Sequence, residues 1–402
     1  MILILQLILA VISIAYYFTG YDVWLTIYAK PTATPFIVAF ALAAIILVIL
    51  GSWKFFPSTL LAWCTFFVLV SVILASSESW VSKDGITSEL PIRLISVTVV
   101  LTETVFFTRY QQVQIWTRRA IFVAVIYALG NNFYELVNPE IFTQTVDPAL
   151  LDIANLSGRP AGIYLDPNRA GGALILGMIF SIGIIPASFR FIYALIIGLG
   201  VFITFSRGAI IAWLVVFAIL LFQGAFKIRL TKNFVVGFII SLALLSFVGL
   251  SNLGGIELHS NNQERLETFF GGSAGEDSGR GGLAELARDK FIASPLIGYG
   301  TGADIGAGGQ QGGKGAHNGY LKYMVENGFL GGLFLPTLVF AVAWNAKGQA
   351  KDVALPFMAF MLIWGFFSHN ILEERHILTL VGLMAAMKKV GCIEMEKLSP
   401  EK

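Results

Sequence analysis

Residues 190–223, RFIYALIIGLGVFITFSRGAIIAWLVVFAILLFQ, decide the fold of this chain. Two apolar runs, 190–205 and 208–223, are separated only by Ser206 and Arg207. Each run is close to the length of about 20 residues that crosses the hydrocarbon core of a bilayer. Inside lipid the backbone must satisfy its own hydrogen bonds, which makes such runs helical. The stretch therefore predicts a membrane hairpin whose turn carries an arginine.

The composition extends this interpretation to the whole chain. Of its 402 residues 56% are hydrophobic and only 13% are charged, and the mean hydropathy is +0.76. A soluble domain has about 25% charged and about 45–50% apolar residues. The shortage of charge excludes a water-soluble enzyme, a disordered scaffold and a nucleic-acid-binding protein. We predict an all-α polytopic membrane protein with about 12 transmembrane helices, in the apolar runs 1–19, 34–51, 58–76, 91–108, 119–134, 168–187, 190–205, 208–223, 233–250, 318–344, 353–368 and 377–388.

The basic residues predict the orientation of these helices. Lys and Arg concentrate in short cytoplasmic loops, and a cytoplasmic N-terminus places nearly all the basic short connections there. Of the 25 Asp and Glu residues, only Asp352, Glu394, Glu396 and Glu401 then lie inside. We expect an uncleaved first helix and two cytoplasmic termini. The basic residues assigned to the cytoplasmic side are Lys54, Arg109, Arg118, Arg119, Arg190, Lys227, Arg229, Lys232, Lys347, Lys351, Lys388 and Lys389.

The same orientation divides the chain into three parts. Residues 1–250 hold helices 1–9 with an outer loop at 135–167, and residues 317–402 hold helices 10–12 and a cytoplasmic tail. Between them, 251–316 form a large glycine-rich outer loop. Within it, residues 283–292 have the apolar spacing of a short amphipathic helix. Loops of this length are usually functional or disordered.

Three arginines lie on the outer face, where the positive-inside tendency does not place them. Arg207 is held near the outer boundary by the tight hairpin, which predicts a preset anion site or a turn that binds lipid headgroups. Arg280 is flanked by glycines before the amphipathic helix, which favours either an anion contact or a solvated loop charge. Arg159 precedes the helix at 168–187, which Asn168 or Asp166 can cap, and a snorkelling arginine is an equal alternative.

His317 stands at the beginning of the run 318–344. An imidazole at a helix N-terminus feels the positive end of the helix dipole, which disfavours its protonation. A neutral imidazole at pH 7 suits a general base, and a histidine that caps the helix or binds a headgroup is the alternative. Tyr320 lies on the same helical face, whereas Glu326 lies nearly opposite and is interpreted as structural.

Other polar residues carry weaker signals. Glu103, near the middle of the fourth run, is either functional or a polar packing contact inside the bundle. His369 and His376 could share a face, but their spacing is not a metal-ligand motif and indicates a turn between the last two helices. We predict no metal site and no cofactor.

Four of these motifs resemble those of the bacterial O-antigen ligase and O-antigen polymerase superfamily. Arg159, Gly162 and Asn168 follow its Arg-x-x-Gly-x(5)-Asn pattern, and the Ser-Arg-Gly hairpin at 206–208 is similar. Gly279-Arg280, with the amphipathic helix and Ser294-Pro-Leu-Ile-Gly-Tyr-Gly300, is similar to the signature of its large periplasmic loop. The most specific match is His317-Asn-Gly-Tyr-Leu321 with Glu326-Asn-Gly328 and Gly331. The resemblance covers roughly residues 155 to 335.

The resemblance implies an inverting, metal-independent glycosyltransferase of the bacterial inner membrane. Such enzymes take a glycan from an undecaprenyl-pyrophosphate carrier, and the ligases transfer it to a sugar hydroxyl of lipid A–core on the periplasmic face, which completes lipopolysaccharide. The expected partners are this donor, this acceptor and membrane lipids, without nucleic acid or nucleotide. By matching position, His317, Arg207 and Arg280 are the expected catalytic residues. The expected substrate-binding residues are Arg159, Asn168, Arg288, Asn318 and Tyr320.

Arginine chemistry agrees with this implication, because guanidinium groups offer paired donors suited to phosphate oxygens. Two alternatives stay open. A polymerase, which joins carrier-linked repeat units, uses the same donor chemistry, and an exopolysaccharide variant is included with it. A transporter for a lipid-linked glycan is the alternative from another class. Transporters place ionisable groups near the midplane and show internal repeats, whereas here the arginines gather at one face and no repeat is visible.

Overall fold

The structure is a computed structural model that describes residues 1–28, 34–75, 83–138, 159–226, 280–303 and 317–398. Within these ranges the side chains at 26–28, 75, 83–88, 280–281 and 391–398 are not described. About 80% of the described residues are helical and none forms a strand. The predicted all-α class is therefore confirmed for this part of the chain.

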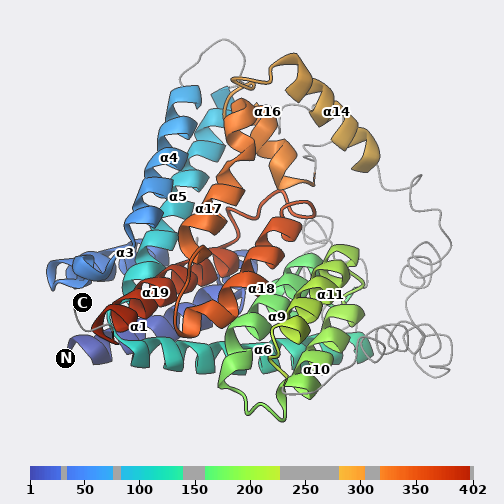
Figure 1. Cartoon of the computed structure of the whole chain (residues 1–402). Helices are drawn as coiled ribbons and strands as arrows, with labels where there is room; N and C mark the ends of the chain where they lie inside the picture. The colour runs from blue at the N-terminus through green and yellow to red at the C-terminus, as the bar shows by residue number, and fades with distance from the viewer. Residues whose placement is uncertain (29–33, 76–82, 139–158, 227–279, 304–316, 399–402) are drawn as a thin grey trace.

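Most of the apolar runs form helices close to their predicted limits (Figure 1). The elements are α1 (Ile2–Ser13) with η1 (Ile14–Phe18), α2 (Tyr21–Tyr28), α3 (Thr34–Ile49), η2 (Ser52–Phe55), α4 (Ser58–Ala75), α5 (Lys83–Phe107), α6 (Gln111–Val137), η3 (Gly162–Tyr164), α9 (Pro167–Ser181) with η4 (Ile182–Ile184), α10 (Arg190–Ile203), α11 (Arg207–Phe222), α14 (Arg280–Ala293), α16 (Gly319–Gly332), α17 (Phe334–Ala343), α18 (Gln349–Trp364) and α19 (Arg375–Leu398).

Three described helices are long and apolar enough to cross a membrane by themselves: Glu89–Phe107, Gln111–Val137 and Pro167–Ile184. The helices α16 and α17 pass the same test as one span that is bent by 56°. Five shorter apolar helices accompany them, at Ile2–Phe18, Thr34–Ile49, Ser58–Leu74, Arg190–Ile203 and Arg207–Phe222. The count of about 12 transmembrane helices stays a prediction, and the run 233–250 lies outside the described residues.

The helix predicted over 119–134 begins earlier than expected. The predicted run starts at Arg119 and leaves Arg118 before it, but both arginines lie inside α6, which runs from Gln111 to Val137. Neither proline nor glycine interrupts the first 19 residues of this helix, so the helix propagates through the two arginines. The helices also extend into the predicted outer loop at 135–167, because α6 ends at Val137 and α9 begins at Pro167.

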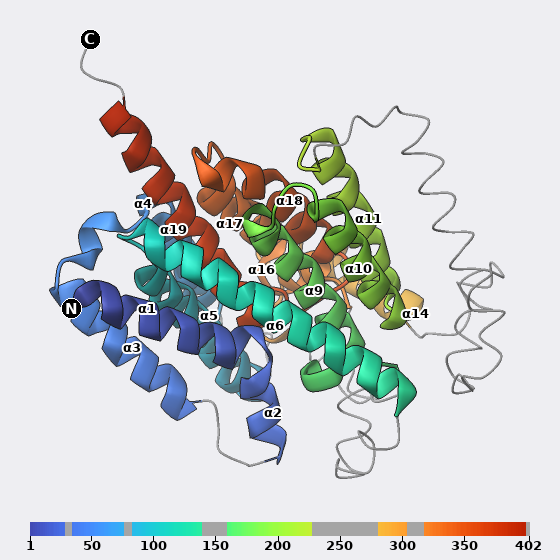
Figure 2. The same cartoon turned by 90° about the horizontal axis from the view of Figure 1, so that it is seen from below.

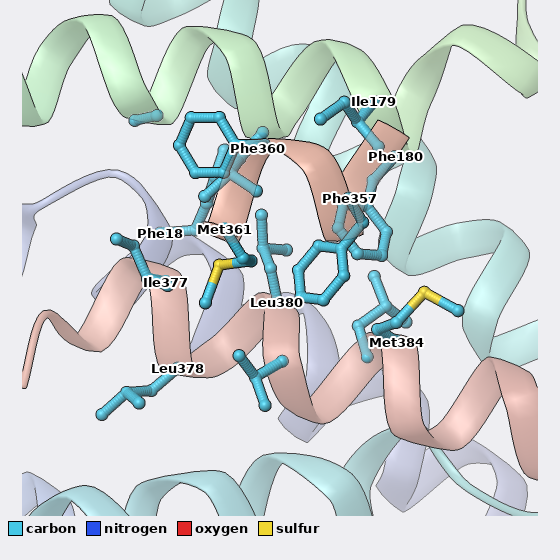
Figure 3. Packing of buried hydrophobic residues seen from close by; sticks show 14 of the residues in the cluster. Phe18, Ile179, Phe180, Phe357, Phe360, Met361, Ile377, Leu378, Leu380 and Met384 are labelled. Atoms are coloured by element: carbon cyan, nitrogen blue, oxygen red, sulfur yellow. The ribbon is translucent and has the colours of Figure 1, made fainter. Parts of the chain in front are cut away.

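The core lies where α9, α18 and α19 meet. Phe357, Phe360 and Met361 of α18 interleave with the apolar face of α19, next to Ile179 and Phe180 of α9 (Figure 3). These side chains are almost wholly buried. The helix α19 therefore contributes a whole face to the core. The N-terminal end of α1 and the C-terminal end of α19 lie at the same side of the molecule (Figure 1, Figure 2).

Cationic side chains close helix ends at one end of the bundle. The C-terminal carbonyl groups of a helix carry partial negative charge, which cations stabilise. Arg118 donates from Nε to the Phe180 carbonyl at 2.6 Å, within the last turn of α9. Further donations of this kind run from Arg109 to the Leu50 carbonyl, from Arg190 to the Ile185 carbonyl and from Lys388 to the Ala341 carbonyl. This is the end that the charge pattern assigns to the cytoplasm. The opposite end, named the His317 end below, contains the first residues of α9, α11, α16 and α19.

Candidate functional site

At the His317 end, the first turns of α9 and α11 are held together by one hydrogen bond. Asp166 caps α9, because its Oδ1 accepts from the backbone N–H groups of Asn168 and Arg169 at 2.7 and 3.0 Å. Ser206 caps α11 and donates from Oγ to the Asn168 Oδ1 at 2.8 Å. The predicted cap at Asp166 or Asn168 is thus Asp166, and two positively polarised helix ends lie side by side.

Arg159 joins the same place from outside the helices. Its side chain is buried, and its Nε donates to the Thr204 carbonyl at 3.2 Å, in the turn that leads into α11. Arg207 is the first residue of α11 and is partly buried. Arg159 and Arg207, which lie 48 residues apart in the sequence, are therefore both found at this turn. Their shared anion site stays a prediction.

The residue after Arg207 touches a segment from the far end of the chain. A side-chain carbon added at Gly208 would lie 2.6 Å from Cγ of Phe367, so that only glycine permits this approach. Phe367 belongs to the segment between α18 and α19, residues 365–374, which we name the α18–α19 turn. The beginning of α11 is therefore packed directly against this turn.

His317 contacts the same turn. The rings of His317 and His369 lie edge to face with centroids 5.1 Å apart. The backbone N–H of Gly319 donates to the Gly365 carbonyl at 2.8 Å, which fixes the start of α16 against the end of α18. His317 has a φ of 42°, a left-handed conformation that is uncommon for a side chain other than glycine. Such conformations persist where the surroundings enforce them, often at functional sites.

The α18–α19 turn carries a buried carboxylate that the sequence analysis did not select. Glu374 lies 3.6 Å from Nε of Arg169 and accepts a hydrogen bond from Ser368 at 3.3 Å. Burial raises the pKa of Glu374 to about 7, against the opposing effect of the Arg169 guanidinium. Burial lowers the pKa of His369 to about 3, with Lys322 acting in the same direction. The imidazole of His369 is therefore neutral at physiological pH.

The residues of the α18–α19 turn could have been noticed in the sequence. Five titratable residues fall within eight positions, 369–376, between two apolar runs, which is dense for a simple turn in a membrane protein. The turn was predicted correctly, but its contact with Arg169 and His317 depends on packing that the sequence does not display. Among the described residues no group of three potential metal ligands occurs. His376 lies in α19, whereas His369 lies in the α18–α19 turn.

A cavity of about 280 Å³ adjoins this turn. Its lining comes from four parts of the chain: η1 and α2, η3, the start of α9, and the turn with the start of α19. Polar side chains at its wall include Arg169, Glu374, Arg375 and His376, and Tyr17 and Tyr164 supply aromatic surface.

The remaining predicted site residues are Asn318, Tyr320, Arg288 and Arg280. Asn318 caps α16 by accepting from the Leu321 N–H at 3.2 Å, and the Tyr320 hydroxyl donates to the Leu362 carbonyl at 2.9 Å. Both side chains thus hold the start of α16 in place. Arg288 is exposed on α14, where its Nε lies 3.8 Å from Oδ1 of Asp289. Arg280 begins α14, and its side chain lies outside the described part.

The segment after α14 explains the motif at 326–328. Asn327 and Gly328 break α16, and Gly328 has a φ of 59°. The freed backbone groups pair with residues 294–300, because Tyr299 donates to the Val325 carbonyl at 2.8 Å and Gly300 to the Glu326 carbonyl at 2.9 Å. Glu326 is fully buried, forms an ion pair with Arg93 and accepts from the Gly302 N–H at 3.1 Å. Its structural interpretation is supported by these contacts.

Glu103 also has a packing contact. Its Oε2 accepts a hydrogen bond from the Ser13 hydroxyl at 2.8 Å, and both side chains are buried. This contact agrees with the polar packing alternative.

Comparison with protein families adds an independent observation. A family model described as O-Antigen ligase matches residues 192–335. The chain is similar to the O-antigen ligase family. The match includes Arg207, Arg280 and His317, and it ends before the α18–α19 turn. It covers less than half of the chain and does not separate ligases from polymerases. A comparison with curated proteins finds no match.

Proposed function

We propose that the protein is an inverting, metal-independent glycosyltransferase that transfers O-antigen glycan from undecaprenyl pyrophosphate to a sugar hydroxyl of lipid A–core. The family match supports ligase- or polymerase-type glycosyl transfer in polysaccharide biosynthesis. The reaction would take place on the periplasmic face of the bacterial inner membrane. In this proposal residues 1–250 and 317–402 form the membrane helices, and residues 251–316 form the large periplasmic loop.

One observation carries this proposal. The α18–α19 turn contacts Gly208 through Phe367 and His317 through His369, so that the neighbour of a candidate phosphate-binding arginine and the candidate base touch the same ten-residue segment. Arg159 and Asn168 reach the adjoining turn before α11. A single displacement needs a leaving-group site and a base at one place.

The proposed chemistry is one displacement at the anomeric carbon. The bond from this carbon to the pyrophosphate oxygen breaks while a bond to the acceptor oxygen forms on the opposite face. His317 takes the proton of the acceptor hydroxyl. Arg207 and Arg280 bind the pyrophosphate and stabilise the negative charge that develops on it, with Arg159 assisting. Arg288, Asn168, Asn318 and Tyr320 complete the substrate-binding set.

The decisive experiment mixes purified protein, carrier-linked glycan and lipid A–core in detergent with EDTA. Glycosylated lipid A–core is expected without a membrane gradient and without divalent metal. Transport cannot produce this product, so its formation separates the proposal from a transporter. If no product forms while the protein binds the donor and remains folded, the transferase proposal is wrong.

A polymerase is the second candidate, because the same family match applies to it. The lipids of a deletion strain distinguish the two. Untouched long glycan on the carrier indicates a ligase, whereas lipopolysaccharide that carries a single repeat indicates a polymerase.

A further inference from the structure

The cavity beside the α18–α19 turn has balanced charge. Arg375 is paired with Asp22, and Arg169 lies 3.6 Å from Glu374. The third carboxylate at the wall, Glu373, accepts from the Nζ of Lys322 at 2.6 Å. Because each cation already has a carboxylate partner, the cavity has little net charge with which to attract a pyrophosphate. Its polar wall favours a neutral ligand with many hydroxyl groups.

Two buried polar atoms of residues that line this cavity have no hydrogen-bond partner among the described residues: the Glu374 Oε2 and the His376 Nε2. They lie 3.6 Å apart, beyond hydrogen-bonding distance, and their side chains are only 8% and 6% exposed. Buried polar groups without partners are costly, and such exceptions often mark a missing water or ligand. One hydroxyl group could donate to the carboxylate oxygen while it contacts the imidazole.

The size and rim of the cavity limit its occupant. Small-molecule pockets usually measure about 300–1,000 Å³, and 280 Å³ lies just below that range, so that one ring fits and an oligosaccharide does not. Arg169 and Arg375 are 32% and 29% exposed, so water reaches the rim. Tyr164, which lines the cavity, packs edge to face with His376, with ring centroids 5.9 Å apart.

We propose that this cavity binds a single uncharged sugar ring, with Glu374 and His376 as its hydroxyl-binding residues. The inference rests on the proposed function for the identity of that ring, which belongs to the acceptor or to the transferred glycan. The turn connects the two sites, since Glu374 lines the cavity and His369, five residues earlier, contacts His317.

The test measures sugar binding without turnover. Saturation-transfer difference NMR is recorded on the full-length protein in a detergent without a sugar headgroup, with D-glucose, D-galactose and N-acetyl-D-glucosamine as probes. The wild-type protein is expected to give a saturable signal with at least one probe. Glu374→Gln is expected to weaken binding at least tenfold, because the amide is neutral and has one acceptor oxygen where the carboxylate has two. The matched control is Glu103→Gln, which also changes a buried carboxylate and is expected to leave binding unchanged.

A second pair of variants does not depend on the carboxylate. Val23 lines the cavity, so Val23→Phe is expected to fill it and abolish binding, whereas Val23→Ala keeps it open and preserves binding. Absence of a signal from every probe, an unchanged signal in Val23→Phe, or displacement of the sugar by inorganic pyrophosphate would overturn the inference. None of these results depends on glycosyl transfer, so a failed transfer assay and a failed cavity assay are distinguishable.

Kinetics then identify the source of the ring. A higher KM for lipid A–core in Glu374→Gln, with unchanged donor binding, assigns the ring to the acceptor. The reverse pattern assigns it to the carrier-linked glycan. Either result supports a sugar site in the cavity.

Discussion

His317 and His369 meet edge to face, with 5.1 Å between ring centroids, although His317 precedes α16 and His369 lies in the α18–α19 turn. His369 stays neutral at physiological pH because burial lowers its pKa to about 3. It therefore packs against His317 without adding a positive charge. This contact makes the α18–α19 turn part of the surroundings of the proposed base.

The first prediction separates the base from its neighbour. His317→Ala is expected to lower transfer to lipid A–core by about 10²–10⁴-fold, the usual contribution of a general base. His369→Phe keeps an aromatic ring beside His317 and is expected to retain most of the activity. Initial rates in detergent, with donor binding measured in parallel, check both. Near wild-type rates in His317→Ala would show that another group accepts the proton.

The second prediction concerns the donor site. Arg207→Lys keeps the charge and loses the paired planar donors, so the KM for the carrier-linked glycan is expected to rise about tenfold. The matched control is Arg119→Lys, because Arg119 is exposed on α6 and its guanidinium lies over the Trp116 ring. Equal KM values for the two variants would remove Arg207 from the donor site.

The third prediction tests the contact between α11 and the turn. Gly208→Ala places a carbon 2.6 Å from Cγ of Phe367, so the turn or the helix must move, and transfer is expected to fall at least tenfold. Phe367→Ala opens the space and is expected to restore much of the loss in the double variant. If the double variant is as inactive as Gly208→Ala alone, the contact does not transmit the defect.

The fourth prediction concerns the buried ion pair between Arg93 and Glu326. Removing one partner leaves an uncompensated buried charge, and the expected loss for Arg93→Met or Glu326→Met is about 3–5 kcal/mol in the free energy of unfolding. The double variant leaves no unpaired charge and is expected to lose much less than the sum. Unfolding in mixed micelles provides the three values, and strictly additive losses would contradict the pairing.

The fifth prediction is a pH dependence. The pKa of Glu374 rises from 4.5 to about 7 on folding, so the folded protein binds more protons than the unfolded chain between these values. This carboxyl therefore makes the fold less stable as pH rises from about 4.5 to 7. Glu374→Gln removes the effect, and its melting temperature is expected to exceed that of the wild-type protein increasingly between pH 5 and pH 8. A difference that does not change with pH would show that the carboxyl does not titrate in this range.

Much of the local structure could be predicted from the sequence. The hairpin at Ser206, the cap of α9 and a helix over 283–292 follow from residue types and spacing over a few positions, and the structure contains each of them. The predicted start of α6 was wrong. The predicted helix began at Arg119, whereas α6 begins at Gln111 and continues through Arg118 and Arg119. Local preference could not reveal that Arg118 would reach the end of α9.

Arg169 and Glu374 illustrate the other limit. Each was visible in the sequence, but 205 positions separate them, and only the packing of α9 against the turn brings their side chains within 3.6 Å. The ion pair of Arg93 with Glu326 spans 233 positions in the same way.

The sequence by itself determined that this chain forms apolar helices with an arginine hairpin, because lipid demands apolar side chains and backbone hydrogen bonds within each segment. Only the tertiary structure decided which polar residues share a site. Contacts between helix ends depend on how the helices pack, and that packing is the joint result of the whole apolar core rather than of any one segment.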